Sequence, residues 1–196
     1  MSSTIKKTDL KDLMPQMTNV NHARSRPYVM NNSHNDEWYT PEKYIEMARR
    51  VLKKIDLDPA SCAYANKTVK AVQYFSIEDD GLQHTWNGNV WMNPPYGSKL
   101  IGKFADKFAT EFRDGHIREG IVLVNNATDS KWFRQLAKEA SAIVFVNGRI
   151  TFNSSTQESK RPLQGQAFLY FGTQKEAFMK EFSAIGIVCS VNHQNN

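Results

Sequence analysis

Asn93-Pro94-Pro95-Tyr96 is the stretch of this sequence best suited to chemistry. A proline holds the residue before it extended, so the two prolines stiffen the loop. The Asn93 side-chain oxygen and the Pro94 carbonyl oxygen can then accept both hydrogens of a planar amino group, while Tyr96 stacks on a flat ring. Two such acceptors favour a tetrahedral nitrogen whose lone pair points at an electrophilic methyl group. The alternative is a strand that simply ends at two prolines and turns at Gly97.

The elements around this loop must bring it to a ligand. Asn93 follows a predicted strand over 89–92, and Asp58 follows a short predicted strand over 55–57. A helix is expected to begin at Thr40 as N-cap, with Pro41 at the first helical position. Further strands are expected at 69–75, 121–125, 142–146, 149–152, 166–171 and 187–191, and further helices at 101–112, around 132–136 and at 174–183.

Strands that alternate with helices predict an α/β fold with a mostly parallel, doubly wound sheet and an antiparallel C-terminal addition. Ligands bind at the carboxyl ends of the strands in such sheets, where both Asp58 and Asn93 fall. Residues 1–36 are polar and basic and are expected to form a flexible arm. Residues 37–191 then form one domain, and residues 192–196 a frayed tail.

The composition excludes several classes of protein. A chain of 196 residues with 40% hydrophobic and 23% charged residues is neither wholly disordered nor collagen-like. No apolar run is long enough for a membrane span, and two cysteines cannot form a disulfide framework. We therefore expect an intracellular, cytoplasmic protein without a metal. The net charge of +5 fits a polyanionic partner but also fits a merely soluble basic surface.

Aromatic residues crowd the first half of the chain and are candidates for stacking on flat ligands. They are Trp38, Tyr39, Trp86, Trp91 and Tyr96.

Four motifs in order resemble the small phage-type DNA N6-adenine methyltransferases of the Dam family, from about residue 37 to about residue 172. They are Trp38-Tyr39-Thr40-Pro41, Leu57-Asp58-Pro59-Ala60-Ser61, Asp79-Asp80-Gly81-Leu82 and Asn93-Pro94-Pro95-Tyr96. The resemblance implies a Rossmann-like methyltransferase fold that uses S-adenosylmethionine, needs no metal and acts on double-stranded DNA. One departure is that the loop after the first strand lacks the glycines common in methyltransferases.

The resemblance also implies roles for individual residues. Asp58 and its loop would hold the methionine end of the cofactor, and Asp79 or Asp80 would bind its ribose or its adenine amino group. Paired acids before a glycine also suit a solvated turn, and Thr40-Pro41 also suits a plain helix cap. The implied catalytic residues are Asn93, Pro94, Pro95 and Tyr96, and the implied cofactor-binding residues are Trp38, Tyr39, Thr40, Pro41, Asp58, Pro59, Ala60, Ser61, Asp79, Asp80 and Asn93.

The target adenine must leave the duplex to reach such a site. The polar loop from Asn153 to Gly165 and the basic arm are expected to contact DNA, and a plain surface loop is the alternative. The candidate DNA contacts are Arg149, Gln157, Lys160, Arg161 and Gln164. A GATC target is only a family-level expectation, a monomer is compatible with the sequence, and a phage or prophage origin is expected.

Two other functions remain open on the sequence. One is an amino methyltransferase acting on protein glutamine or ribosomal RNA, which would use the same Asn93 to Tyr96 chemistry. Two features argue against it: the chain has the Trp38 to Pro41 motif, and it lacks a glycine-rich cofactor loop. The other is a non-catalytic nucleic-acid-binding domain on a methyltransferase scaffold, against which the intact motif at Asn93 argues.

Overall fold

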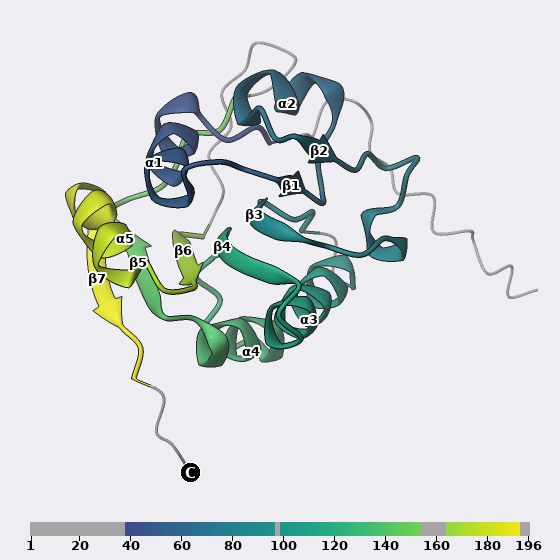
Figure 1. The fold of residues 1–196 in the computed structure, drawn as a ribbon. Helices are drawn as coiled ribbons and strands as arrows, with labels where there is room; N and C mark the ends of the chain where they lie inside the picture. The colour runs from purple at the N-terminus through teal and green to yellow at the C-terminus, as the bar shows by residue number, and fades with distance from the viewer. Residues whose placement is uncertain (1–37, 97–98, 154–163, 193–196) are drawn as a thin grey trace, which may run out of the picture. The chain divides into compact units, whose positions relative to one another are not determined.

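The computed structural model describes residues 38–96, 99–153 and 164–192 (Figure 1), and all of them fall in the unit Asn32–Asn196. The described elements, in chain order, are α1 (Glu42–Leu52), β1 (Leu57–Asp58), α2 (Ala63–Val69), β2 (Gln73–Tyr74), the 3-10 turn η1 (Gly81–Gln83), β3 (Gly88–Met92), α3 (Leu100–Arg113), β4 (Ile117–Asn125), α4 (Lys131–Glu139), β5 (Ala142–Val146), β6 (Gln166–Phe171), α5 (Lys175–Phe182), the 3-10 turn η2 (Ser183–Ile185) and β7 (Gly186–Ser190).

The strands form one sheet in the order β2-β1-β3-β4-β6-β5-β7. β2, β1, β3 and β4 pair in parallel, whereas β6 pairs antiparallel with both β4 and β5, and β7 pairs antiparallel with β5. Five of the described strands therefore share one direction, and β6 and β7 oppose it. This arrangement confirms the α/β, Rossmann-like fold with an antiparallel C-terminal addition.

Helices cover both faces of the sheet (Figure 1), and β4 shows how the sequence supports this. Ile121 and Leu123 face the core under α1 and α5, and the alternate residues Val122 and Val124 face the core under α3 and α4. All four side chains are fully buried. A strand buried on both faces must read as a continuous apolar run, which is the pattern that predicted it.

The start of α1 differs from the prediction by one residue. The helix begins at Glu42, Pro41 occupies the N-cap position, and no side chain caps the first turn. The predicted Thr40 cap is therefore wrong, because the Thr40 hydroxyl is engaged elsewhere. The apolar face of the helix lies in the core as predicted, at Tyr44, Ile45, Ala48, Val51 and Leu52.

The region predicted as a strand over 69–75 is mostly wrong, since only Gln73–Tyr74 pairs. Before it lies α2, a short helix that the sequence pattern did not predict. Its N-cap is Cys62, whose sulfur accepts a hydrogen bond from the Ala65 amide at 3.4 Å. From within α2, the Asn66 side chain accepts from the amide of Ala71 and donates to its carbonyl oxygen, just beyond the end of the helix. Local side-chain bonds shape this segment, and they leave no apolar periodicity.

The predicted strand over 149–152 is also wrong. Ile150 and Phe152 are buried, which produced the alternating pattern, but the segment joins no strand of the sheet. The Ile150 amide bonds the Gln166 side chain instead, and Asn153 forms an isolated bridge with Tyr39. Within the described residues, no helix is long and apolar enough to cross a membrane.

Candidate active site

Asn93 lies directly after β3, beside the end of β1, at the carboxyl edge of the parallel strands. Its Nδ2 atom donates to the Trp38 carbonyl oxygen and to Thr40 Oγ1, both at 3.3 Å. Its Oδ1 atom is buried and has no hydrogen-bond partner among the described residues. A buried acceptor without a partner is costly, so this oxygen is suited to an amino group supplied by a ligand.

The segment Trp38-Tyr39-Thr40-Pro41 therefore lies against the predicted catalytic loop. Thr40 is buried and uses its hydroxyl on Asn93 rather than on the first turn of α1. The Trp38 ring packs against Phe152, with 5.5 Å between ring centroids. The structure thus brings together two motifs that are far apart in the chain, since Thr40 and Asn93 differ by 53 in residue number.

Tyr39 joins the same segment to two further parts of the site. Its ring lies 4.6 Å from the Tyr64 ring, and its hydroxyl lies 3.9 Å from the Cys62 sulfur, directly after the Asp58 loop. Its backbone pairs with Asn153 through two hydrogen bonds of 3.0 and 2.9 Å. Tyr39 consequently links the end of β1 to the start of the predicted DNA loop.

Asp58 is a buried carboxyl at the end of β1, with 3% of its surface exposed. Its Oδ1 atom accepts from the Ala60 amide at 3.3 Å. Burial raises the pKa of Asp58 to about 7, against the opposing effect of the Ser61 hydroxyl and the Ala60 amide. The Ser61 hydroxyl is itself buried and makes no hydrogen bond of good geometry within the described part of the chain. Both groups suit a polar, cationic ligand.

The loops after β1 and β2 are pressed together. The Gly81 backbone lies so close to Pro59 that a Cβ on Gly81 would collide with the Pro59 carbonyl oxygen. The Ser61 amide donates to the Phe75 carbonyl at 2.9 Å, and the buried Trp86 indole donates to the Gly81 carbonyl at 2.8 Å. Two predicted cofactor segments therefore form one continuous wall.

Asp79 and Asp80 are exposed and both organise the turn that precedes Gly81. Asp79 accepts from the amide and the hydroxyl of Ser76, both at 2.8 Å, and these bonds lower its pKa. Asp80 accepts from the Leu82 amide and the Gln83 side chain, both at 3.2 Å. A cofactor role for either acid stays a prediction, since each carboxylate has capacity for further hydrogen bonds.

Tyr96 presents a half-buried ring with a buried hydroxyl that has no hydrogen bond of good geometry among the described residues. Burial raises the pKa of Tyr96 well above its usual value, and the Asn125 backbone opposes this rise. The phenol is therefore neutral at physiological pH. Its predicted stacking on a base stays a prediction.

The predicted stacking role is wrong for two of the other aromatic residues, Trp86 and Trp91. Trp86 and Trp91 are 0% and 1% exposed and belong to the core. Trp86 packs against Phe104 and Phe108, and Trp91 lies near Phe168. Composition could not separate these tryptophans from Trp38, because burial depends on the elements that pack around each ring: Trp91 lies on β3 inside the covered sheet, and Trp86 packs against α3.

Gln166 is a functional candidate that the sequence reasoning missed. It is fully buried and bonds three segments: its Oε1 accepts from the Ile150 amide at 2.9 Å, and its Nε2 donates to Asn125 Oδ1 at 3.3 Å and to the Gln164 carbonyl at 2.7 Å. These bonds hold both flanks of the predicted DNA loop at the end of β4. A lone glutamine heading an apolar strand was the signal available.

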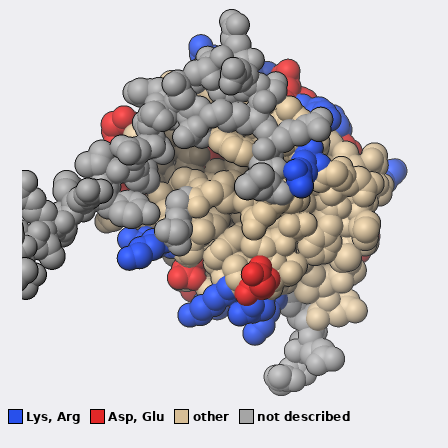
Figure 2. All heavy atoms as spheres, turned by 180° about the vertical axis from the view of Figure 1, so that it is seen from behind, with Lys and Arg blue, Asp and Glu red and all other residues tan. Residues whose placement is uncertain are grey.

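Two of the five predicted DNA contacts lie in the described residues, and both Arg149 and Gln164 are exposed. Gln157, Lys160 and Arg161 lie outside the described residues, as does the basic arm. On the face that Figure 2 shows, the Lys and Arg side chains of the described residues lie in several separate groups, one of them beside Asp and Glu side chains, and do not gather into one basic patch. Charge on that face therefore does not by itself locate DNA.

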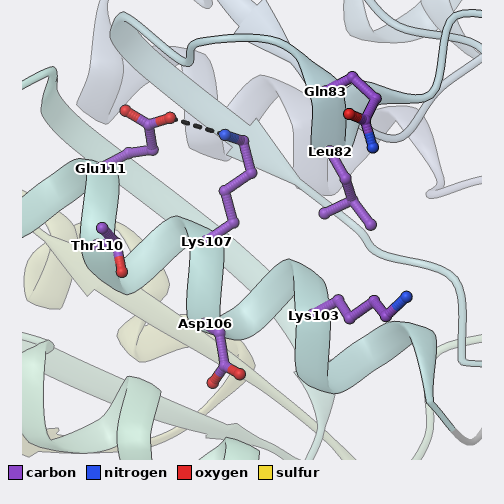
Figure 3. A pocket seen from close by; sticks show the side chains of 7 residues that line it. All are labelled: Leu82, Gln83, Lys103, Asp106, Lys107, Thr110 and Glu111. Atoms are coloured by element: carbon purple, nitrogen blue, oxygen red, sulfur yellow. Dashed lines mark hydrogen bonds and ion pairs between the residues drawn. The ribbon is translucent and has the colours of Figure 1, made fainter.

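A separate hollow of about 430 Å³ lies between η1 and α3 (Figure 3). Leu82, Lys103 and Lys107 line it, and Lys107 forms an ion pair with Glu111 at 2.8 Å. None of its lining residues is a predicted site residue, so we do not assign it to the reaction. The described residues contain no group of three or more His, Cys, Asp or Glu side chains that could hold a metal ion.

Comparison with known proteins places this arrangement in a family context. The model of a family described as DNA N-6-adenine-methyltransferase (Dam) matches residues 29–195. A DNA N-6-adenine-methyltransferase of Haemophilus phage HP1 is 30% identical over 144 residues, which cover 71% of this chain and 80% of that protein. Another of Escherichia phage T1 is 27% identical over 128 residues, which cover 64% of this chain and 51% of that protein.

Proposed function

The chain belongs to the DNA N-6-adenine-methyltransferase (Dam) family and is a DNA adenine methyltransferase, and we propose that it uses S-adenosylmethionine to methylate N6 of an adenine flipped out of the duplex. The observation that carries the proposed mechanism is the buried, unpartnered Oδ1 of Asn93 at the carboxyl end of β3. An amino group that donates to this oxygen satisfies it.

Asn93 Oδ1 and the Pro94 carbonyl oxygen accept the two N6 hydrogens of the adenine. The amino nitrogen of adenine is a poor nucleophile because its lone pair is delocalised into the ring. Two fixed acceptors favour a tetrahedral nitrogen and need no reorganisation during the reaction. Tyr96 supports the base by stacking, and its hydroxyl is buried and neutral.

The residues at the ends of β1 and β2 fit the cofactor. S-adenosylmethionine supplies an activated methyl group, and its methionine end carries an ammonium group. The buried Asp58 carboxyl and the Ser61 hydroxyl suit that end, because a positive charge beside Asp58 stabilises its ionised form. The wall formed by Pro59 and Gly81 borders the same place, and Asp79 and Asp80 are the candidates for the ribose or the adenine amino group.

Double-stranded DNA is the proposed partner, with the 153–165 loop and the basic arm supplying the contacts. The loop is suited to this role because its first residue, Asn153, pairs with Tyr39, next to Thr40 and Pro41 in the site. The similar proteins come from phages that infect bacteria, which favours the bacterial cytoplasm as the place of action.

The decisive experiment incubates the purified chain with S-adenosylmethionine and unmethylated DNA, followed by mapping of modified adenines by methylation-sensitive digestion and sequencing. We expect methyl groups on N6 of adenine at a defined site. A matched reaction with Asn93→Ala controls for a contaminating methyltransferase. Methylation of protein or RNA with unmodified DNA would overturn the proposal.

A further inference from the structure

Two hydrogen-bond acceptors from the segment before α1 hold the amide group of Asn93. Nδ2 donates to the Trp38 carbonyl oxygen and to Thr40 Oγ1, both at 3.3 Å. A backbone carbonyl can only accept, so the nitrogen and not the oxygen of the amide must face Trp38. This leaves Asn93 Oδ1 on the opposite side, buried and without a partner among the described residues.

An asparagine amide without such contacts is ambiguous. Rotation by half a turn exchanges its oxygen and its nitrogen at almost the same shape, so only hydrogen bonds decide which one faces a substrate. The reversed amide of Asn93 would set Oδ1 against the Trp38 carbonyl and present a donor to the substrate's own donor. An adenine amino group could not bind to that form.

We propose that Thr40 and the Trp38 carbonyl are positioning groups that fix the Asn93 amide with its oxygen toward the adenine amino group. This inference rests on the proposed function of Asn93. Thr40 is well placed for this role, because it is 8% exposed and Pro41 after it restricts its backbone to extended conformations. Its neighbour Tyr39 is tied to Asn153 by two backbone bonds.

The same contacts explain why this chain carries asparagine and not aspartate at position 93. A carboxylate has no hydrogen to donate, so one of its oxygens would face the Trp38 carbonyl, and two acceptors would oppose each other in a buried site. The Trp38 carbonyl thus selects an amide and its orientation, and the Thr40 hydroxyl, which can donate or accept, adds a second bond that holds the selected amide in place.

The test compares Thr40→Val, which keeps the shape and removes the acceptor, with Thr40→Ser, which keeps the hydroxyl. We expect Thr40→Val to lower kcat about tenfold, as the loss of one hydrogen bond predicts, with little change in KM for DNA or in cofactor affinity. Thr40→Ser should restore most of kcat. The exposed Thr110→Val on α3 is the matched control and should leave kcat unchanged.

A double variant tests whether Thr40 acts through Asn93. In an Asn93→Ala background, Thr40→Val should cause no further loss of rate, because the amide that it positions is gone. A further tenfold loss in that background would overturn the proposal. So would a Thr40→Val variant that loses cofactor affinity and keeps kcat, since Thr40 would then serve the cofactor.

A readout that does not depend on activity separates this inference from the proposed function. In ¹⁵N-labelled protein, the two side-chain amide hydrogens of Asn93 should exchange slowly, and Thr40→Val should speed their exchange severalfold while Thr110→Val does not. Equal exchange in all three proteins would overturn the positioning role. Slow exchange with no methylation of DNA would instead contradict the proposed function alone.

Discussion

Gly81 and Pro59 are in direct backbone contact, although one follows β2 and the other follows β1. No side chain fits between them, because a Cβ on Gly81 would overlap the Pro59 carbonyl oxygen and press on Phe75. The neighbouring Asp80 takes a positive φ of 48°, and its carboxylate closes the turn on the Leu82 amide. The Asp79-Asp80-Gly81 motif thus allows the loop after β2 to pack closely against the loop after β1.

We expect Gly81→Ala to destabilise the fold by about 1–3 kcal/mol, as overpacking in a dense region does, and to weaken cofactor binding. Thermal unfolding and calorimetry with S-adenosylmethionine measure the two effects. Gly102→Ala on α3 is the matched control, since a Cβ there meets nothing within 4 Å. That control should stabilise the helix slightly. Wild-type stability and affinity in Gly81→Ala would contradict the packing argument.

We expect Asn93→Ala to slow methyl transfer strongly but measurably, while it leaves cofactor affinity within about twofold of wild type. The loss of a fixed acceptor in a preorganised site should lower kcat on the order of 10²-fold or more. Turnover assays and cofactor calorimetry on the same preparation check both parts. Near-normal turnover would contradict the proposed mechanism. Lost cofactor binding would instead assign Asn93 to the cofactor site.

The stability of the cofactor-free protein should fall as pH rises from about 4 to about 7 and level off above that. Burial raises the pKa of Asp58 to about 7 from its ordinary value of 3.8, so in this window the folded state binds a proton that the unfolded chain has released, and each rise in pH then favours the unfolded chain. One pKa unit corresponds to about 1.36 kcal/mol, so the change amounts to a few kcal/mol at most. Denaturant unfolding at several pH values measures it. Asp58→Asn should flatten the profile, and an identical slope in both proteins would contradict the assignment.

Replacement of Gln157, Arg161 and Gln164 by alanine should relax or abolish the choice of DNA site without changing cofactor affinity. Glutamine and arginine pair bidentately with adenine and guanine edges, whereas phosphate contacts carry no sequence information. Sequencing of methylated sites in a random DNA library reports the preference. A truncation of residues 1–30 is the comparison and should weaken binding evenly across sequences. Unchanged relative rates in the loop variant would place recognition elsewhere.

The sequence predicted the elements that depend on burial. Residues 121–124 of β4 and 167–171 of β6 read as continuous apolar runs, and α1 and α3 carry apolar stripes at helical spacing, so the centre of the sheet and both of its covered faces could be anticipated. Asp58 and Asn93 could be placed at the same edge because parallel strands end there together.

The parts that could not be predicted depend on single hydrogen bonds between distant segments. Thr40 has the residue type of a helix cap, and only the fold shows that its hydroxyl contacts Asn93. Ile150 and Phe152 alternate like a strand, yet the Gln166 side chain takes the amide bond that a strand partner would have taken. Local patterns cannot reveal such competition, because the partner is far away in the chain.

The two anchors of the 153–165 loop have an evolutionary consequence. Asn153 is pinned to Tyr39, and Gln166 ties the Gln164 carbonyl to Asn125, so the ends of the loop are fixed whatever lies between them. The entropy of closing a longer loop grows only logarithmically, by about 0.6 kcal/mol for each doubling of length. On the proposal that this loop reads the DNA sequence, we expect the protein to tolerate replacement of positions 154 to 163 by the corresponding residues of a relative. Recombination confined to that stretch would then change the recognition sequence and leave the catalytic residues as they are.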